Sequence, residues 1–234
     1  MAALDDLLTE LFDGEQPVFR AEFARWLRGS RRFAAFVTAN RGKIRAKLRT
    51  VRDDGGMQDL RAELETAALL LREERFTLAY EQYAATRQRG PDFTVTFKTH
   101  TPFHVEVRRI RSAELEGTDD GAHTGKLMAV LCDKVGQMPP SSVNLLWLAV
   151  MDGIAEADLT YAATALRRLA ESKADEYFMR RGFKSATDFL RQYQRLSAIV
   201  LRQPHGNVLW LNSLARHRVP PQIAGAIERL ETAI

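Results

Sequence analysis

The stretch from Gly90 to Arg111, GPDFTVTFKTHTPFHVEVRRIR, constrains the fold more than any other part of the chain. Apolar residues occupy every second position in two runs, which are Phe93, Val95 and Phe97 in the first and Phe103, Val105 and Val107 in the second. Alternation of this kind predicts strands with one buried face. We place the turn at His100–Pro102, so the sequence predicts a β-hairpin.

Two acids belong to this hairpin. Asp92 stands at the mouth of the first strand, and Glu106 lies within the second. Carboxylate oxygens are the ligands that hard divalent cations prefer. The two acids therefore predict a metal site at an edge of the sheet.

Composition describes an ordinary soluble globular protein, with 234 residues, 45% hydrophobic and 27% charged. The net charge of +4 is compatible with a polyanionic partner, although so mild an excess is weak support by itself. The single cysteine, Cys132, excludes an internal disulfide framework and a multi-cysteine zinc site, and a reducing cytoplasm is the simplest compartment. No apolar run approaches membrane-spanning length, so we expect no membrane insertion.

The rest of the chain reads as scaffolding around the hairpin. We expect a helical N-terminal extension over residues 1–53, a core over 57–151, and C-terminal helices with a short strand pair over 152–234, forming one globular unit. Within the core we expect a helix over 57–74, strands over 76–82, 93–97 and 103–108, a helix over 126–138 and a strand over 143–151. The polar, glycine-rich segment 112–125 predicts a mobile loop.

A basic segment near residue 45 has two interpretations. Basic residues surround a narrow apolar stripe there, among them Arg41, Lys43, Arg45 and Lys47. One interpretation is the solvated face of a packed helix. The other is a nucleic-acid-binding surface, because Lys and Arg supply the sequence-independent part of nucleic-acid affinity.

The order helix, three strands, helix, strand, combined with the hairpin acids, resembles the PD-(D/E)xK nuclease superfamily. Pro91-Asp92 matches the "PD", and Glu106-Val107-Arg108 matches the "(D/E)xK". The resemblance implies an α/β fold with a restriction-endonuclease-like αβββαβ core, in which a central mixed sheet is flanked by helices. It also implies that Glu63, an acid on the preceding helix, joins the site.

The same resemblance implies a nuclease that acts on DNA, in preference to RNA, with Mg²⁺ or Mn²⁺ as cofactor. Asp92 and Glu106 are the expected metal ligands, with Glu63 as an auxiliary ligand and the Val107 carbonyl as a third oxygen. Such a metal polarises a phosphate oxygen and lowers the pKa of a bound water.

Arg108 departs from the pattern, which has lysine at this position. Arginine stays charged, so it binds phosphate well but is a poor base. One interpretation is that the lysine function has moved to the following helix, to Lys134 in preference to Lys126, beside Gln137. In that case Arg108 and Gln137 contact the phosphate or the water.

Arg108 also fits a site that has lost cleavage and kept the binding of nucleic acid or a protein partner. A third alternative is that the resemblance arose by chance on an unrelated α/β domain. The fourth is a purely structural interaction module, which would bind neither metal nor nucleic acid. The residues of the motif leave all four alternatives open.

Overall fold

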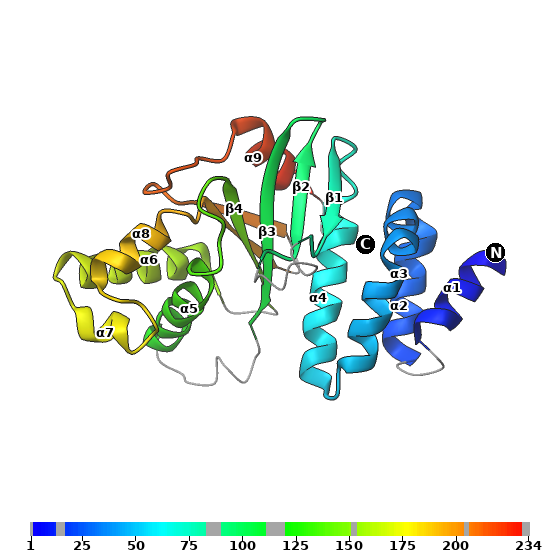
Figure 1. Cartoon of the computed structure of the whole chain (residues 1–234), viewed down its shortest axis with the longest axis horizontal. Coiled ribbons are helices and arrows are strands. Elements are labelled where there is room, and N and C mark those ends of the chain that lie inside the picture. Colours follow the sequence, from blue (N-terminus) through cyan, green and yellow to red (C-terminus); the bar gives the residue numbers. More distant parts are fainter. Residues whose placement is uncertain are drawn as a thin grey trace.

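The chain is an α/β protein in which a six-stranded mixed sheet lies between two groups of helices (Figure 1). The computed structural model describes residues 2–12, 17–82, 90–110, 120–150, 154–203 and 206–230. The helices are α1 Ala2–Phe12, α2 Pro17–Gly29, α3 Arg31–Thr50, α4 Asp54–Leu70, α5 Asp120–Val135, α6 Glu156–Glu171, α7 Asp175–Met179, α8 Ala186–Tyr193 and α9 Pro221–Glu228. The strands are β1 Phe76–Tyr80, β2 Phe93–Phe97, β3 Thr101–Arg109, β4 Val143–Ala149, β5 Ala198–Gln203 and β6 Gly206–Leu211.

The strands lie in the sheet in the order in which they follow one another along the chain. β1, β2 and β3 form an antiparallel meander, β3, β4 and β5 are parallel, and β6 returns antiparallel to β5. Each parallel step is connected through helices, as parallel pairing requires. The predicted order of helix, three strands, helix and strand is present from α4 to β4.

The sheet separates two hydrophobic cores, and β4 shows how one strand serves both. Leu145 and Trp147 belong to the core that faces α1–α4 and α9, whereas Leu146 and Leu148 belong to the core that faces α5–α8. Successive side chains of a strand point to opposite faces, so a strand covered on both faces must be apolar throughout. This geometry explains the continuous apolar run that predicted a central strand.

The N-terminal helices share the first of these cores with the sheet. A chain of ring contacts runs from α1 and α2 through α3 to the first two strands; its members are Phe12, Phe19, Phe23, Trp26, Phe33, Phe36, Tyr80 and Phe93. α3 also contacts the turn between α4 and β1 through Arg32. The Arg32 guanidinium donates to the carbonyl oxygens of Leu71 at 2.6 Å and Glu73 at 2.8 Å, and also to that of Phe76.

Two predicted boundaries around α5 are wrong. Part of the loop predicted over 112–125 is helical, because α5 begins at Asp120; residues 112–119 lie outside the described residues. The helix also ends at Val135, three residues before the predicted end. Glycine costs only about 1 kcal/mol within a helix, and the packing of α5 against α6 outweighs it. Gly136 and the prolines that follow explain the early end.

The turn of the central hairpin was also misplaced. It lies at Lys98–His100, and β3 begins at Thr101, because Pro102 pairs with Thr96 instead of belonging to the turn. Pro102 is tolerated since the parallel ladder with β4 begins only at the next residue, Phe103. The helix predicted over 57–74 is α4, which begins three residues earlier because Asp53 caps it by accepting from Gly56 N–H at 2.7 Å.

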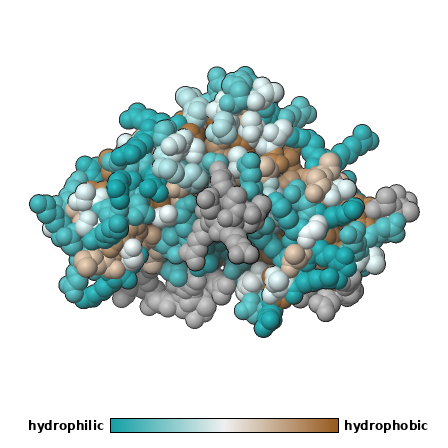
Figure 2. All heavy atoms as spheres, in the orientation of Figure 1, coloured by the Kyte–Doolittle hydropathy of each residue, from teal (hydrophilic) through white to brown (hydrophobic). Residues whose placement is uncertain are grey.

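The face of the molecule seen in Figure 2 is mostly hydrophilic, with apolar residues scattered among polar ones. The large apolar side chains that are exposed, such as Val18, Tyr161 and Met179, belong to different helices. Of the helices in the described ranges, none combines the length and the apolar composition needed to cross a bilayer.

Because Arg32 satisfies three carbonyl groups at once, we expect Arg32→Met to lower the free energy of unfolding by about 2–4 kcal/mol. Chemical denaturation measures the change. Arg31→Met is the matched control: Arg31 is exposed on the same helix, and its replacement should cost less than about 0.5 kcal/mol. Equal effects of the two changes would contradict this account of how α3 is held.

Candidate functional site

The site lies beside the first residue of β2, where the pairing of β2 with β3 stops and β3 continues. The last β2–β3 pair at this end is Phe93 with Val105, so the next residues of β3 have no partner strand on that side. Asp92, the residue before β2, occupies the vacant position, and its Oδ2 accepts a hydrogen bond from Val107 N–H at 2.7 Å. The side chain therefore replaces the missing backbone partner. This arrangement fixes the Asp92 carboxylate beside the backbone of Val107.

Helix α5 brings a lysine to the second acid of the hairpin. Lys134 Nζ lies 2.8 Å from Glu106 Oε1, and both side chains are largely buried, 15% and 11% exposed respectively. The sequence placed Lys134 on the boundary between the polar and apolar faces of its helix, and from that boundary it reaches the sheet. The predicted approach of Lys134 to Glu106 is thus present in the structure.

Helix α4 contributes the third acid from the opposite side of the sheet. Glu63 is 8% exposed and lies among the residues that face the first hydrophobic core. Lys47 of α3 donates to both of its carboxylate oxygens, at 2.7 and 2.9 Å. The notch beside β3 therefore brings together acids from α4 and from the sheet, with one lysine from the helices on each face of the sheet.

These side chains line one cavity of about 280 Å³. Seven of the residues singled out in the sequence lie on its wall: Glu63, Asp92, Glu106, Val107, Arg108, Lys134 and Lys47. The cavity continues toward the start of α4, where Arg109 donates to Asp59 Oδ1 at 2.9 Å and to the Gly55 carbonyl at 3.1 Å. The wall therefore carries acids at its centre and several cations around them.

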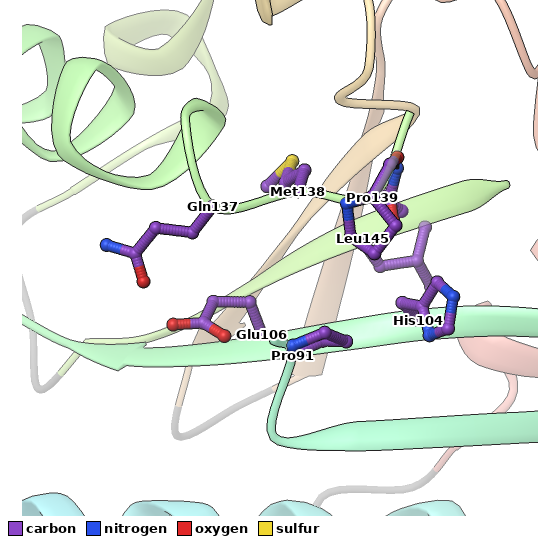
Figure 3. Close-up of a pocket in the computed structure, with 8 residues that line it drawn as sticks. Pro91, His104, Glu106, Gln137, Met138, Pro139 and Leu145 are labelled. Carbon is purple, nitrogen blue, oxygen red and sulfur yellow. Dashed lines mark hydrogen bonds between the residues drawn. The ribbon is translucent and has the colours of Figure 1, made fainter. Parts of the chain in front are cut away.

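Gln137 lies on the neighbouring side of Glu106. It follows the end of α5, and together with Glu106 it lines a small cavity of about 10 Å³, which has room for one water molecule. Figure 3 shows the Gln137 side chain extending over Glu106, with His104 and Pro91 along the same wall. Gln137 is thus beside Glu106 but is not part of the larger cavity's wall.

The basic residues predicted to bind nucleic acid divide into different environments. Arg41 is exposed and lies 3.9 Å from Glu10. Lys43 donates to the carbonyl oxygens of Tyr80 at 2.6 Å and Glu81 at 3.3 Å, and Arg45 is half-buried. Of the four, only Lys47 lines the larger cavity.

The three acids raise one another's pKa. Burial, followed by the charge of Asp92, raises the pKa of Glu63 to about 7. Burial and the charge of Glu106 raise the pKa of Asp92 to about 7, against the lowering effect of the Val107 N–H. Burial likewise raises the pKa of Glu106, although Lys134 opposes the shift. Strongly shifted acids that share a cavity mark a candidate functional site.

Lys47 holds its charge in spite of burial. Burial lowers its pKa, but the ion pairs with Glu63 and Glu81 outweigh that effect and the net shift is upward. Its ammonium also lies 2.7 Å from Glu81 Oε1 and 5.1 Å from the centre of the Tyr80 ring.

The donor set fits a hard divalent cation, because carboxylate oxygens are the ligands of Mg²⁺ and Mn²⁺. In the present arrangement, however, each acid already has a partner: Lys47 for Glu63, Val107 N–H for Asp92, and Lys134 for Glu106. Across the described ranges, no three His, Cys, Asp or Glu side chains are placed so that they could hold one metal ion. A cation shared by the three acids therefore requires side-chain rearrangement.

Sequence reasoning missed two features of this site. It placed Lys47 either on the solvated face of a helix or on a nucleic-acid surface, although the ammonium lies within the acid cluster. It also gave no role to Glu81, which follows β1 and holds Lys47. The Tyr80–Glu81 pair at the end of a predicted strand was the available signal, but helix α3 and β1 are far apart in the sequence and nothing in it indicated that they meet.

The raised pKa values predict how stability depends on pH. A carboxyl group whose pKa is higher in the folded protein destabilises the fold when it ionises, so these acids lower stability as pH rises from about 4 to about 7. We expect Asp92→Asn to raise the free energy of unfolding at pH 8 by roughly 2–4 kcal/mol, and to have little effect at pH 4. Denaturation at both pH values measures this.

The control is Asp133→Asn, which removes one exposed carboxylate from α5 and should change stability by less than about 0.5 kcal/mol. A loss of stability in Asp92→Asn at pH 8 would contradict the predicted strain of buried like charges.

Comparisons with known proteins identify no relative. The sequence matches no protein-family model, and searches of curated proteins and of solved structures return no match.

Proposed function

We propose that the protein is a metal-dependent nuclease with a restriction-endonuclease-like core, which hydrolyses phosphodiester bonds in DNA in preference to RNA. The observation that carries the proposal is the position of Lys134. Its ammonium lies 2.8 Å from Glu106, in the cavity that Asp92 and Glu63 also line. Helix α5 thereby brings a lysine to the acids, whereas the motif position itself is occupied by Arg108.

The proposed metal-binding residues are Asp92 and Glu106, with Glu63 as an auxiliary ligand. Their oxygen donors suit Mg²⁺ or Mn²⁺. A divalent cation held there would polarise a phosphate oxygen and lower the pKa of a bound water. The Val107 backbone lies beside Asp92, which agrees with a role for its carbonyl as a further oxygen donor.

Lys134 is the proposed catalytic lysine. A lysine ammonium can give up a proton and can hold a water molecule by hydrogen bonding, whereas the guanidinium of Arg108 stays charged. Lys134 would orient the attacking water next to Glu106. Gln137 adjoins Glu106 on its other side, and its amide, which donates to the Asp133 carbonyl at 3.2 Å, would contact the same water after turning toward the larger cavity.

Arg108 and the basic side of α3 are proposed to bind the substrate backbone. Arg108 lines the cavity, and its planar guanidinium matches two phosphate oxygens at once. Arg41, Lys43 and Arg45 lie on the helix that carries Lys47 into the cavity. They would extend the phosphate-binding surface away from the acids.

The test of the proposal is hydrolysis of single- and double-stranded DNA, and of RNA, by the purified protein with Mn²⁺ or Mg²⁺. We expect cleavage that chelation abolishes. Asp92→Ala should remove it, because one proposed metal ligand is lost. If the wild-type protein cleaves none of these substrates and binds no Mn²⁺, the proposal that it is a metal-dependent nuclease is refuted.

Lys134→Met tests the catalytic lysine separately. We expect a loss of activity of about 100-fold or more, with Mn²⁺ binding retained, because general acid–base groups contribute about 10²–10⁴-fold. Lys126→Met is the matched control: Lys126 lies on the same helix and is not among the residues that line the cavity, so activity should stay within about twofold. A larger loss of activity in Lys126→Met would assign the role of catalytic lysine to Lys126 instead.

A second candidate is a catalytically inactive protein of the same fold that binds nucleic acid or a protein partner. Arg108 in the motif position favours it, and so does the pairing of the outer acids with lysines. It predicts salt-dependent DNA binding that survives Asp92→Ala, in a protein that cuts nothing. Metal-dependent cleavage that Asp92→Ala abolishes would exclude it.

A further inference from the structure

Lys47 bridges two acids that have different surroundings. Its ammonium lies 2.7 and 2.9 Å from the two oxygens of Glu63, and 2.7 Å from Glu81 Oε1. Glu63 lines the cavity of about 280 Å³, whereas Glu81 is not among its lining residues. One positive charge therefore connects the proposed metal site to an acid outside it.

Glu81 is held firmly in that outer position. Its backbone N–H donates to the Asp92 carbonyl at 2.8 Å, and its own carbonyl accepts from Lys43. Its backbone is in the left-handed region, with φ of 45°, which costs a residue other than glycine on the order of 1–3 kcal/mol. The chain thus maintains an unfavourable conformation that keeps the Glu81 carboxylate against Lys47.

A cation and the Lys47 ammonium compete for Glu63. Both oxygens of Glu63 are engaged by the ammonium, so a cation that takes either oxygen must displace one of these hydrogen bonds. Two positive charges side by side in a largely buried cavity also repel each other strongly. Glu81 offers the displaced ammonium a partner without moving it into solvent.

We propose that Lys47 is a charge placeholder: it neutralises Glu63 while the metal is absent, and it keeps only its contact with Glu81 when a divalent cation binds to Glu63. This inference rests on the proposed metal site at Glu63, Asp92 and Glu106. It makes Lys47 and Glu81 positioning residues that set the affinity for the cation. Helix α3 lies before the segment that resembles a nuclease core. Through Lys47, this helix then regulates the binding of the cation at the site.

The test is the affinity for Mn²⁺, measured by titration calorimetry at pH 8 on the full chain. Lys47→Met should bind Mn²⁺ more tightly, by about fivefold to tenfold, because the competing charge is gone. Glu81→Gln should bind it more weakly, by about threefold to tenfold, because the displaced ammonium has lost its second partner. A structural defect would weaken binding in both variants, so the opposite signs are the signature.

A double-mutant cycle separates this mechanism from simple loss of charge. In the Lys47→Met background, Glu81→Gln should change the Mn²⁺ affinity by less than about twofold, because Glu81 acts through Lys47. Equal weakening by Glu81→Gln in both backgrounds would show that Glu81 attracts the cation through space, and would overturn the proposal.

Arg31→Met is the matched control. Arg31 is exposed on the same helix and is not among the residues that line the cavity, so its loss should leave Mn²⁺ affinity within about twofold. If Lys47→Met binds Mn²⁺ no more tightly than the wild type, the placeholder role is wrong while the metal site stands. If the wild-type protein binds no Mn²⁺ at all, the proposed metal site itself fails.

Discussion

Burial of three carboxylates in one cavity is the constraint on which this structure depends. Glu63, Asp92 and Glu106 come from α4, from the residue before β2 and from β3; Glu63 and Glu106 are buried and Asp92 is half-buried. Buried like charges destabilise a fold unless cations, hydrogen bonds or protons compensate them. The protein supplies a lysine to each outer acid and a backbone N–H to the central one. A fold that only needed stability would do better with apolar residues here, which argues that the acids serve a function.

The helices around the sheet supply the positive charges that compensate the buried carboxylates. α3 and α5 pack on opposite faces, and each sends one lysine to the notch beside β3. The N-terminal helices therefore do more than cover the sheet, because the ring contacts and Arg32 that hold α3 also set the position of Lys47. The end of α3 and Val51, which belong to the segment that looks like an extension in the sequence, contribute one wall of the candidate site.

The sequence predicted the features that depend on local residue patterns, namely strands and helix faces. Alternation in the hairpin and the unbroken apolar run of β4 determined the strands, and the helical stripe of α5 placed Lys134 on the boundary of its apolar face. The pattern could not show that Phe93, the first residue of β2, pairs with Val105 and so leaves Val107 beyond the paired region, because the register depends on pairing between strands. For the same reason, the sequence could not predict the contacts of Lys47 with Glu63 and Glu81: they join segments 16 and more residues apart, across a tertiary interface. The sequence misplaced the start of α4, where Asp53 caps the helix, and the start of α5, where tertiary packing outweighs the cost of glycine.

The central claim is that the three acids form one cation site beside Lys134. Its most direct test is a crystal structure of the protein soaked in Mn²⁺, with the anomalous signal used to locate the ion. The account predicts one strong peak at coordination distance from carboxylate oxygens of Asp92 and Glu106, about 2.0–2.3 Å, with the Lys134 ammonium close by. An ordered site without any peak, or a peak held by other residues, would contradict it.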